Sequence, residues 1–422
     1  MPELERSLSL WQITLMSIGI ILGAGIYVVI GESAGLTGNS VWLSFIIGAI
    51  VASFSGLSYA ELASRFPKAG AEYVYVENSF GTRVAWIAGW LVLSGSVIGG
   101  ATVVIGFSRY FSALFNTPII LIAIIVLIII GIILIIGVQE TASLTIFFTL
   151  IESIGLIIII VIGLPYLGKV NYLEMTNGIK GLIEGGILIF FSYIGFQGVA
   201  RLAEETKDPE KNIPKAIIYS LSITTIIYIL VALSAVSIVP WSELAASKGP
   251  LALVAQYVLG ENSIFILSVI ALFSTFNTAL VMLLSGSRLL FGIGERKAIP
   301  KVFTSVLKSF KTPWIAIIAV IFASSIFLFL EDLKTVANLT NFTIFMVFII
   351  INSSVIYYRF KKPIKSGFKV PISIGRLPVI PVLGIATSIF MISNISYNVL
   401  LIGGILLIIG LITDLILNLK YE

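Results

Sequence analysis

The chain has 422 residues, of which 58% are apolar and only 11% are charged. Soluble globular proteins carry roughly 25% charged residues, so this composition argues against a water-soluble protein. There is no Cys and no His, so disulfides, thiol chemistry and the usual metal sites are not expected. The loops leave no room for a soluble catalytic domain, and no phosphate-binding loop of the Walker kind occurs. We therefore expect no cofactor, no enzyme activity and no use of ATP.

The first apolar segment follows Arg6 and runs to about Ile30, and no small-residue cleavage site ends it. It is predicted to be a retained helix and not a signal peptide. Residues 119 to 138 contain only Ile, Leu, Val, Ala and Gly. Twenty residues at a rise of about 1.5 Å match the roughly 30 Å hydrocarbon core of a bilayer. This segment alone predicts a membrane-spanning helix.

Hydropathy along the chain predicts an all-α polytopic membrane protein with twelve transmembrane helices. The first six predicted spans are 9–31, 40–63, 83–112, 118–138, 142–166 and 181–203, and the second six are 213–239, 262–293, 314–330, 334–359, 377–394 and 397–418. Residues 208–214 carry the Pro pattern of a helix start. Residues 250–260 are expected to form a short helix at the membrane surface.

The positive charges predict the orientation. With twelve spans, five of the 26 Lys and Arg residues fall on one side, and the others fall on the side of both termini. Lys and Arg are retained on the cytoplasmic side, so both termini are expected in the cytoplasm of a multi-pass plasma membrane protein. The net charge of +5 is thus a topology signal, and no nucleic-acid partner is inferred. The five Lys and Arg residues on the side opposite the termini are Arg109, Lys169, Lys180, Lys248 and Lys334.

Two predicted spans carry glycines that weaken a helix. The first contains GIILGAGI (Gly19–Ile26), and the sixth contains GGILIFFSYIGFQG (Gly185–Gly198). Transporters built from inverted repeats place discontinuous helices at equivalent positions of their halves, whereas small residues elsewhere simply allow close helix packing. Both explanations remain open. A broken helix leaves amides that attract carboxylates and carbonyls that attract ammonium groups, so two breaks suit a zwitterionic amino acid.

Several motifs resemble the amino acid-polyamine-organocation (APC) superfamily. GIILGAGIYVVIG is similar to its first span, and YAELASRFPKAGAEYVYVENSFG (Tyr59–Gly81) to its second span and following loop. Phe190–Ile217 resembles the sixth span and the loop after it, and Ser287–Phe303 the end of the eighth, although ERKAIP departs from the family pattern. The resemblance implies five spans repeated in inverted order, residues 1–166 and 181–359, followed by two C-terminal helices, 377–418. Helices one and six are then discontinuous.

The resemblance also implies the substrate-binding residues. In the first span they belong to the unwound segment whose amides hold a carboxylate, and in the sixth to the unwound segment whose carbonyls hold an amino group. Phe191 matches the aromatic residue that closes over bound substrate, with an ordinary core Phe as the alternative. The implied substrate-binding residues are Ile21, Leu22, Gly23, Ala24, Gly25, Phe191, Ser192, Tyr193, Ile194 and Gly195.

Four further residues are candidates for proton or ion coupling. Glu152 lies about halfway along the fifth predicted span, where a carboxylate is costly and is a functional candidate. The aligned position in proton-coupled relatives can be Lys, so Glu152 is either a proton carrier or a hydrogen-bonded strut. Ser274, Thr275 and Asn277 match small polar residues of the eighth span, although such hydroxyls often bond only to the preceding turn. Gln197 lacks the carboxylate that some members have there.

The expected function is amino acid transport by a secondary active permease, through proton-coupled symport or exchange by alternating access. The alternatives are a transporter of polyamines or other small organic cations, or a channel. The expected partners are a small-molecule amino acid and the lipid bilayer, with protons as an open choice of coupling ion. Oligomeric state and the particular amino acid are not readable from these residues.

Overall fold

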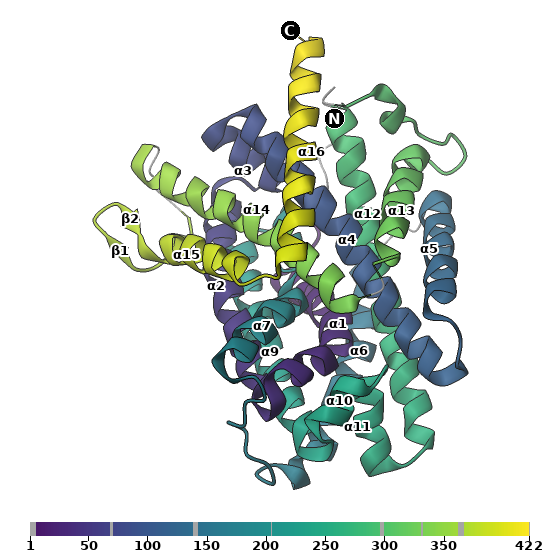
Figure 1. The fold of residues 1–422 in the computed structure, drawn as a ribbon. Helices are drawn as coiled ribbons and strands as arrows, with labels where there is room; N and C mark the ends of the chain where they lie inside the picture. The colour runs from purple at the N-terminus through teal and green to yellow at the C-terminus, as the bar shows by residue number, and fades with distance from the viewer. Residues whose placement is uncertain are drawn as a thin grey trace.

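The computed structural model describes residues 6–67, 71–137, 142–203, 205–295, 299–330, 332–361 and 367–421. Helices dominate this part of the chain (Figure 1). The long helices are α1 (Leu10–Thr37), α2 (Val41–Arg65), α4 (Thr82–Phe115), α5 (Ile119–Ile136), α6 (Ala142–Gly163), α7 (Gly178–Phe190), α9 (Pro209–Ile238), α12 (Asn262–Glu295), α13 (Trp314–Leu328), α14 (Leu333–Lys361), α15 (Val379–Ser393) and α16 (Tyr397–Tyr421).

Smaller elements lie between the long helices. They are α3 (Ala71–Phe80), α8 (Gly198–Arg201), α10 (Trp241–Ala246), α11 (Pro250–Leu259) and a two-stranded antiparallel hairpin, β1 (Ser373–Ile374) with β2 (Leu377–Pro378). The short helix expected at residues 250–260 is present as α11. Helix α3 falls in a segment that was expected to be a loop. In Figure 1, α10 and α11 lie at the opposite end of the molecule from the free end of α16.

Local sequence sets several helix starts. At α1, Ser9 caps the helix: its hydroxyl accepts a hydrogen bond from the Gln12 amide, and the Gln12 side chain accepts one from the Ser9 amide, which is a capping box. Helix α9 begins at Pro209, directly after Asp208, as the Pro pattern predicted. Proline suits the first helical position because its missing amide hydrogen would have no partner there.

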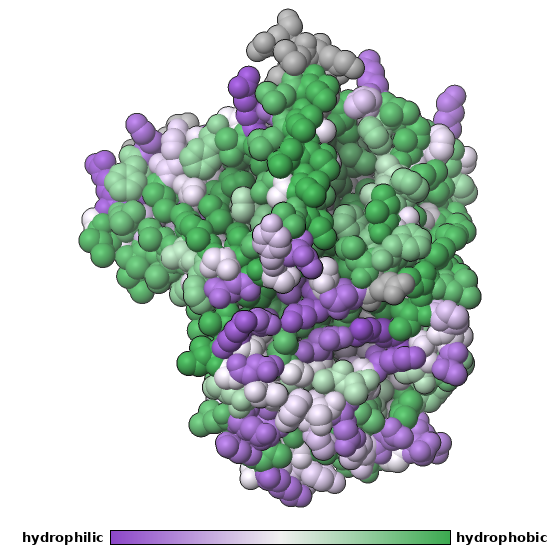
Figure 2. Space-filling view, in the orientation of Figure 1, coloured by the Kyte–Doolittle hydropathy of each residue, from purple (hydrophilic) through white to green (hydrophobic). Residues whose placement is uncertain are grey.

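Several helices of the bundle expose rows of apolar side chains. On α5, the exposed residues are aliphatic and recur every three or four positions, which is one face of a helix. They are Leu121, Ile125, Ile128, Ile129, Ile132 and Ile136. Helices α6 and α16 expose similar rows. Figure 2 shows hydrophobic residues over α16 and its neighbours in the upper part of the view, whereas hydrophilic residues gather over the lower part. Such a surface requires a lipid environment.

Nine helical stretches in the described residues are long and apolar enough to cross a membrane. The first of them, Leu10–Arg65, contains both α1 and α2, and α13 and α15 are apolar helices of 15 residues each. Each of the twelve predicted spans overlaps a helix. The fold is therefore that of a multi-pass helical membrane protein.

Candidate substrate site between two broken helices

The helix α1 is interrupted at Gly23. Its backbone angles, φ −32° and ψ −125°, are not helical, although α1 continues on both sides. This is one of the two interruptions expected from the glycine-rich segments. The helix lies inside the bundle, where it contacts α6, α7, α9 and α12. The kink therefore lies among other helices and not against lipid, as an irregular backbone in a membrane requires.

The second interruption follows α7. Residues Phe191–Tyr193 form a single 3₁₀ turn, Ile194 is extended, and Gly195 has φ +135°, a conformation that favours glycine. The chain becomes helical again at Gly198. The Gln197 side chain stabilises this segment because its oxygen accepts a hydrogen bond from the Gly195 amide over 3.0 Å. Gln197 thus makes a local contact that holds the interrupted segment in its conformation.

The two interruptions touch each other and their neighbours through glycines. A Cβ atom on Gly25 would lie 2.3 Å from Cα of Ser192, and one on Gly23 would lie 2.0 Å from Oγ1 of Thr278. A Cβ atom on Gly195 would lie 2.5 Å from a methyl group of Ile20. Non-bonded heavy atoms do not approach one another this closely, so a side chain at any of these three glycines would have to displace the neighbouring residue. The glycines therefore permit close approach of the two broken segments, at the same positions where the helix weakens.

Tyr228 of α9 links the two broken segments. Its hydroxyl lies 2.5 Å from the carbonyl oxygen of Ile21 and 2.9 Å from that of Ser192. Its ring packs on Phe45 and Tyr193, with ring centroids 5.2 Å and 5.4 Å apart. The Tyr193 hydroxyl in turn donates to the Phe45 carbonyl over 3.0 Å. Tyr228 was not among the residues expected from sequence, because no motif marks an aromatic residue in the seventh span.

The substrate-binding residues expected from sequence lie together at this place and are buried. Phe191 is 3% exposed and Ile194 is 6% exposed. Ile21, Leu22, Gly23, Gly25, Ser192, Tyr193 and Gly195 are buried as well. Ala24 is helical, and its side chain lies outside the described parts of the structure. The Ser192 hydroxyl, on the turn itself, has no hydrogen-bond partner among the described residues.

Glu152 is buried in α6, with 1% of its surface exposed. Ser274 and Asn277 of α12 are its polar neighbours, but neither carboxyl oxygen has a hydrogen-bond partner within the described residues, and neither has the Ser274 hydroxyl. The Tyr27 hydroxyl donates to the backbone carbonyl of Glu152 over 2.9 Å. Thr275 donates to Ala271 in the preceding turn over 2.7 Å. Two of the four coupling candidates, Ser274 and Asn277, thus lie beside the carboxyl group of a third, Glu152.

A chamber of about 100 Å³ adjoins the second interruption. Ile194, Gly195 and Gly198 form one wall, and α4, α12 and α14 form the others. Most of the lining surface is apolar, although polar or charged side chains also reach it from Ser96, Gln197, Arg201, Asn277, Thr278 and Ser285. Asn277 and Thr278 connect it to the polar residues near Gly23 and Glu152. The chamber therefore borders the site that the two broken helices define.

Arg201 closes one side of the chamber. Its guanidinium donates to Glu72 of α3 through Nη2 at 3.0 Å and Nε at 3.3 Å, and to the Ser285 hydroxyl. Glu72 is also within 3.4 Å of the Tyr59 hydroxyl. Arg201 and Ser285 line the chamber, whereas Glu72 lies behind Arg201. Helix α3 therefore contributes to the site.

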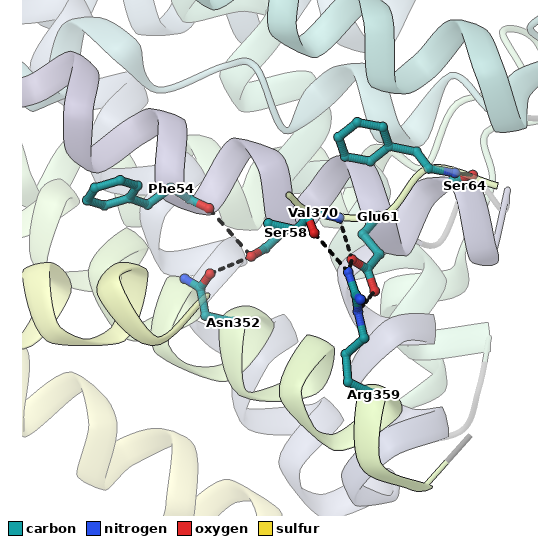
Figure 3. A network of polar contacts seen from close by, with 8 residues as sticks. Phe54, Ser58, Glu61, Ser64, Asn352, Arg359 and Val370 are labelled. Atoms are coloured by element: carbon teal, nitrogen blue, oxygen red, sulfur yellow. Dashed lines mark hydrogen bonds and ion pairs between the residues drawn. The ribbon is translucent and has the colours of Figure 1, made fainter. Parts of the chain in front are cut away.

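A second ion pair lies where α2 and α14 end (Figure 3). Arg359 donates to both carboxylate oxygens of Glu61, over 2.8 Å and 2.6 Å, and Glu61 also accepts from the Val370 amide over 2.7 Å. About one helical turn before Glu61 in α2, the Ser58 hydroxyl donates to the side-chain oxygen of Asn352 over 2.6 Å. This cluster joins α2, α14 and the segment after α14 at one end of the bundle.

A helical bundle with an apolar surface, two interrupted helices in contact and a chamber beside them defines a membrane transport protein. The family model described as amino acid permease matches residues 8–409. The chain therefore belongs to the amino acid permease family and is an amino acid transporter, not an enzyme.

Relatives match almost the whole chain. The branched-chain amino acid permease BcaP of Bacillus subtilis (strain 168) is 29% identical over 448 residues, which cover 100% of this chain and 94% of that protein. A methylthioribose transporter of the same organism is 30% identical and covers 90% of this chain and 86% of its own length. Cationic amino acid transporter 4, vacuolar, of Arabidopsis thaliana is 28% identical over 86% of this chain and 64% of that protein.

Proposed function

We propose that the protein is a secondary active amino acid permease that works by alternating access. In this proposal the chain crosses the membrane twelve times. Residues 1–166 and 181–359 are inverted repeats of five helices each, and residues 377–418 form two added helices. Such repeats place the substrate where discontinuous helices meet near the membrane midplane. Helices α1 and α7–α8 are the discontinuous pair.

The substrate is bound by backbone groups. Its carboxylate takes hydrogen bonds from amides that follow the interruption at Gly23, because a helix N-terminus favours negative charge. Its ammonium group donates hydrogen bonds to the carbonyl oxygens of Ile21 and of Phe191–Ile194. Phe191 covers the bound molecule. A zwitterion satisfies both sets of backbone groups at once, which neither a simple ion nor a polyamine does.

One observation carries this proposal: the two interruptions are in direct contact. The Tyr228 hydroxyl donates to carbonyl oxygens of both segments. Gly25 packs so closely against Ser192 that a larger residue at position 25 would clash with it. Two glycine-rich helices that served only packing would not both need to be non-helical at their point of contact. The family match and the relatives named for branched-chain and cationic amino acids support amino acids as the substrate class.

Protons are the proposed coupling ion. Glu61, Glu72 and Glu152 are buried carboxyl groups, but Glu61 pairs with Arg359 and Glu72 with Arg201. The polar neighbours of Glu152 are the uncharged Ser274 and Asn277. A carboxyl group that is buried without a charged partner strongly favours its neutral form, so access to water on either side of the membrane can change its protonation. Thr275, whose hydroxyl is bonded to the preceding turn, has at most a supporting part.

The decisive experiment is uptake into proteoliposomes. Purified protein should accumulate a labelled amino acid when an inward proton gradient is imposed, and should exchange internal for external amino acid without one. Unlabelled amino acids should compete, whereas putrescine or inorganic ions should not. Uptake that no amino acid inhibits would contradict the proposal, and passive ion conductance would indicate a channel.

The orientation can be tested with single cysteines, because the chain has none. We propose that both termini are cytoplasmic and that the protein lies in the plasma membrane. Ser7 and Ser242 are exposed and fall on opposite sides in this topology. In intact cells, a membrane-impermeant maleimide should label Ser242→Cys and should label Ser7→Cys only after lysis. The reverse result would invert the orientation, and no labelling of either before lysis would place the protein in an internal membrane.

A further inference from the structure

The chamber beside Gly195 has a composition that bears on which amino acid binds. Ile20, Val92, Ile194 and Ile344 supply aliphatic surface from four different elements. No Asp or Glu lines it, and Arg201 is the one ionisable residue among its lining residues. A substrate side chain that enters from the interrupted helices therefore meets hydrocarbon from these four elements and neutral polar groups from Ser96, Gln197, Asn277, Thr278 and Ser285.

The positive charge of Arg201 is balanced by the carboxylate of Glu72. Glu72 is 7% exposed and Arg201 is 27% exposed, and they are joined by two hydrogen bonds with distances of 3.0 Å and 3.3 Å. The third contact of the guanidinium is Ser285. Two-point contact between a guanidinium and a carboxylate is among the stronger ion pairs in proteins. The pair as a whole is neutral, so the side of the chamber that it closes offers no net charge to a substrate.

We propose that this chamber receives the side chain of a neutral, aliphatic amino acid, and that the Arg201–Glu72 pair excludes both cationic and acidic side chains by remaining mutually neutralised. This inference rests on the proposed function, because it assumes that the substrate's charged ends occupy the interrupted helices. A Lys, Arg or Glu side chain would lose its water in the chamber without gaining an opposite charge, which is costly.

The size of the chamber agrees with this class of side chain. An apolar cavity of about 150 Å³ accommodates benzene, and this chamber has about 100 Å³, which suits a branched aliphatic group better than an indole ring. The chamber has free space next to Gly198, because a Cβ atom on Gly198 would meet only a methyl group of Ile20, at 3.8 Å. At Gly95, by contrast, a Cβ atom would lie 2.8 Å from the Thr343 hydroxyl. Gly198 is therefore the position from which a new side chain would fill the chamber.

The first test is a competition assay with wild-type protein in proteoliposomes. Unlabelled leucine, isoleucine, valine, lysine and glutamate compete with a labelled amino acid that the protein takes up. The three aliphatic amino acids should inhibit, and lysine and glutamate should need concentrations at least about tenfold higher. Inhibition by lysine or glutamate as strong as by leucine would overturn the inference while leaving amino acid transport intact. Uptake that no amino acid inhibits would instead refute the proposed function.

The second test fills the chamber. Gly198→Val should weaken competition by leucine and isoleucine about tenfold or more, and competition by alanine much less, because one or two methyl groups in an apolar pocket change binding by roughly 10- to 200-fold. The matched control is Gly404→Val in α16, where a Cβ atom would meet nothing within 4 Å. Equal loss for alanine and leucine in the Gly198 variant would show that the side chain does not enter this chamber.

The third test separates the two charges. Arg201→Gln leaves the Glu72 carboxylate near the chamber and should let lysine compete, whereas Glu72→Gln leaves the guanidinium and should let glutamate compete. The double variant Arg201→Gln/Glu72→Gln should again prefer leucine, and Arg201→Lys should still exclude lysine. Single variants that keep the wild-type order of competitors would show that this ion pair does not select the substrate.

Discussion

The hydroxyl group of Tyr228 lies 2.9 Å from the carbonyl oxygen of Ser192 and also contacts the carbonyl of Ile21. One hydroxyl hydrogen is thus shared between two interrupted helices. Tyr228→Phe removes this donor and keeps the ring that packs on Phe45 and Tyr193. We expect substrate affinity to fall about tenfold, because a hydrogen bond worth about 1 kcal/mol no longer holds the two segments that bind the substrate in their relative positions. Substrate titration by calorimetry measures the change.

A thermal melt in detergent is the control for Tyr228→Phe. The melting temperature should change by only a few degrees because the ring contacts remain. Thr224→Val in the same helix is a matched variant, since it removes a hydroxyl that donates to the Ser220 and Leu221 carbonyls of its own helix. That variant should bind substrate normally. Unchanged affinity in Tyr228→Phe would mean that the bridge between the segments is not needed for binding.

Gly23 gives the second prediction. Gly23→Ala should abolish substrate binding, because the added carbon would lie 2.0 Å from Oγ1 of Thr278 and in the space through which the amides reach a carboxylate. Two causes can be separated. Gly23→Ala/Thr278→Ala removes the atom in conflict, so recovery of binding in the double variant would assign the loss to that clash. Continued loss would assign it to the blocked amides. Wild-type binding in Gly23→Ala would place the carboxylate site elsewhere.

Phe191 gives the third prediction. If it covers the substrate, Phe191→Ala should slow transport and weaken binding, whereas Trp or Tyr should preserve much of the activity. If it is only a buried core residue, which its 3% exposure also fits, the Ala variant should unfold at lower temperature with unchanged transport per folded molecule. A large-to-small change of a buried Phe costs about 3–5 kcal/mol. Uptake and melting temperature measured on one preparation decide between the two roles.

The Glu61–Arg359 pair gives a prediction about stability. Glu61 is 3% exposed and Arg359 is 17% exposed at the side chain, so Arg359→Gln leaves a buried carboxylate with only the Val370 amide. Breaking such a pair costs about 3–5 kcal/mol. The melting temperature should fall clearly. Glu61→Gln/Arg359→Gln should recover most of the loss, and a double variant as unstable as the single one would show that the loss does not come from an unpaired charge.

Sequence patterns predicted the helices well because a membrane imposes long apolar segments. Each predicted span overlaps a helix, and the two interruptions lie at the glycine-rich segments. Helix α3 was not predicted, since Ala71–Phe80 is too short and too polar to show a membrane signal. Hydropathy also cannot show that Glu72 of this helix reaches Arg201, 129 residues away in the chain.

The candidate site was predictable only where a motif marks the backbone. Gly23 and Gly195 are recognisable because glycine permits their conformations and their close contacts. Tyr228 and Thr278 are ordinary residues in apolar helices, and their importance comes from packing between helices that are distant in sequence. No periodicity encodes such a contact. Tertiary contacts of this kind become visible only when the helices are placed in space.

Glu152 gives the last prediction. Its carboxyl group is buried in α6, 1% exposed, and lacks a hydrogen-bond partner within the described residues. Ser274 and Asn277 of α12 are its polar neighbours, so a structural strut would act through contacts with them, since buried polar groups are nearly always hydrogen-bonded. A proton carrier instead needs a group that changes charge when water reaches it, and a buried carboxyl group without a cation beside it holds its proton until then. A buried carboxyl group without a cation beside it is what the proposed carrier role needs, and the Glu152→Gln variant tests that role.

Glu152→Gln keeps the size of the side chain and removes its ability to release a proton. We expect this variant to retain amino acid exchange, which needs no net proton movement, and to lose accumulation driven by an inward proton gradient. Ser153→Ala is the matched control, because the neighbouring hydroxyl donates to the preceding turn at Thr149; it should retain both activities. Gradient-driven accumulation that persists in Glu152→Gln would eliminate the carrier role. Equal loss of exchange and accumulation would instead mean that Glu152 holds α6 against α12, since a strut is needed in every step of the cycle and a proton carrier only in those that move charge.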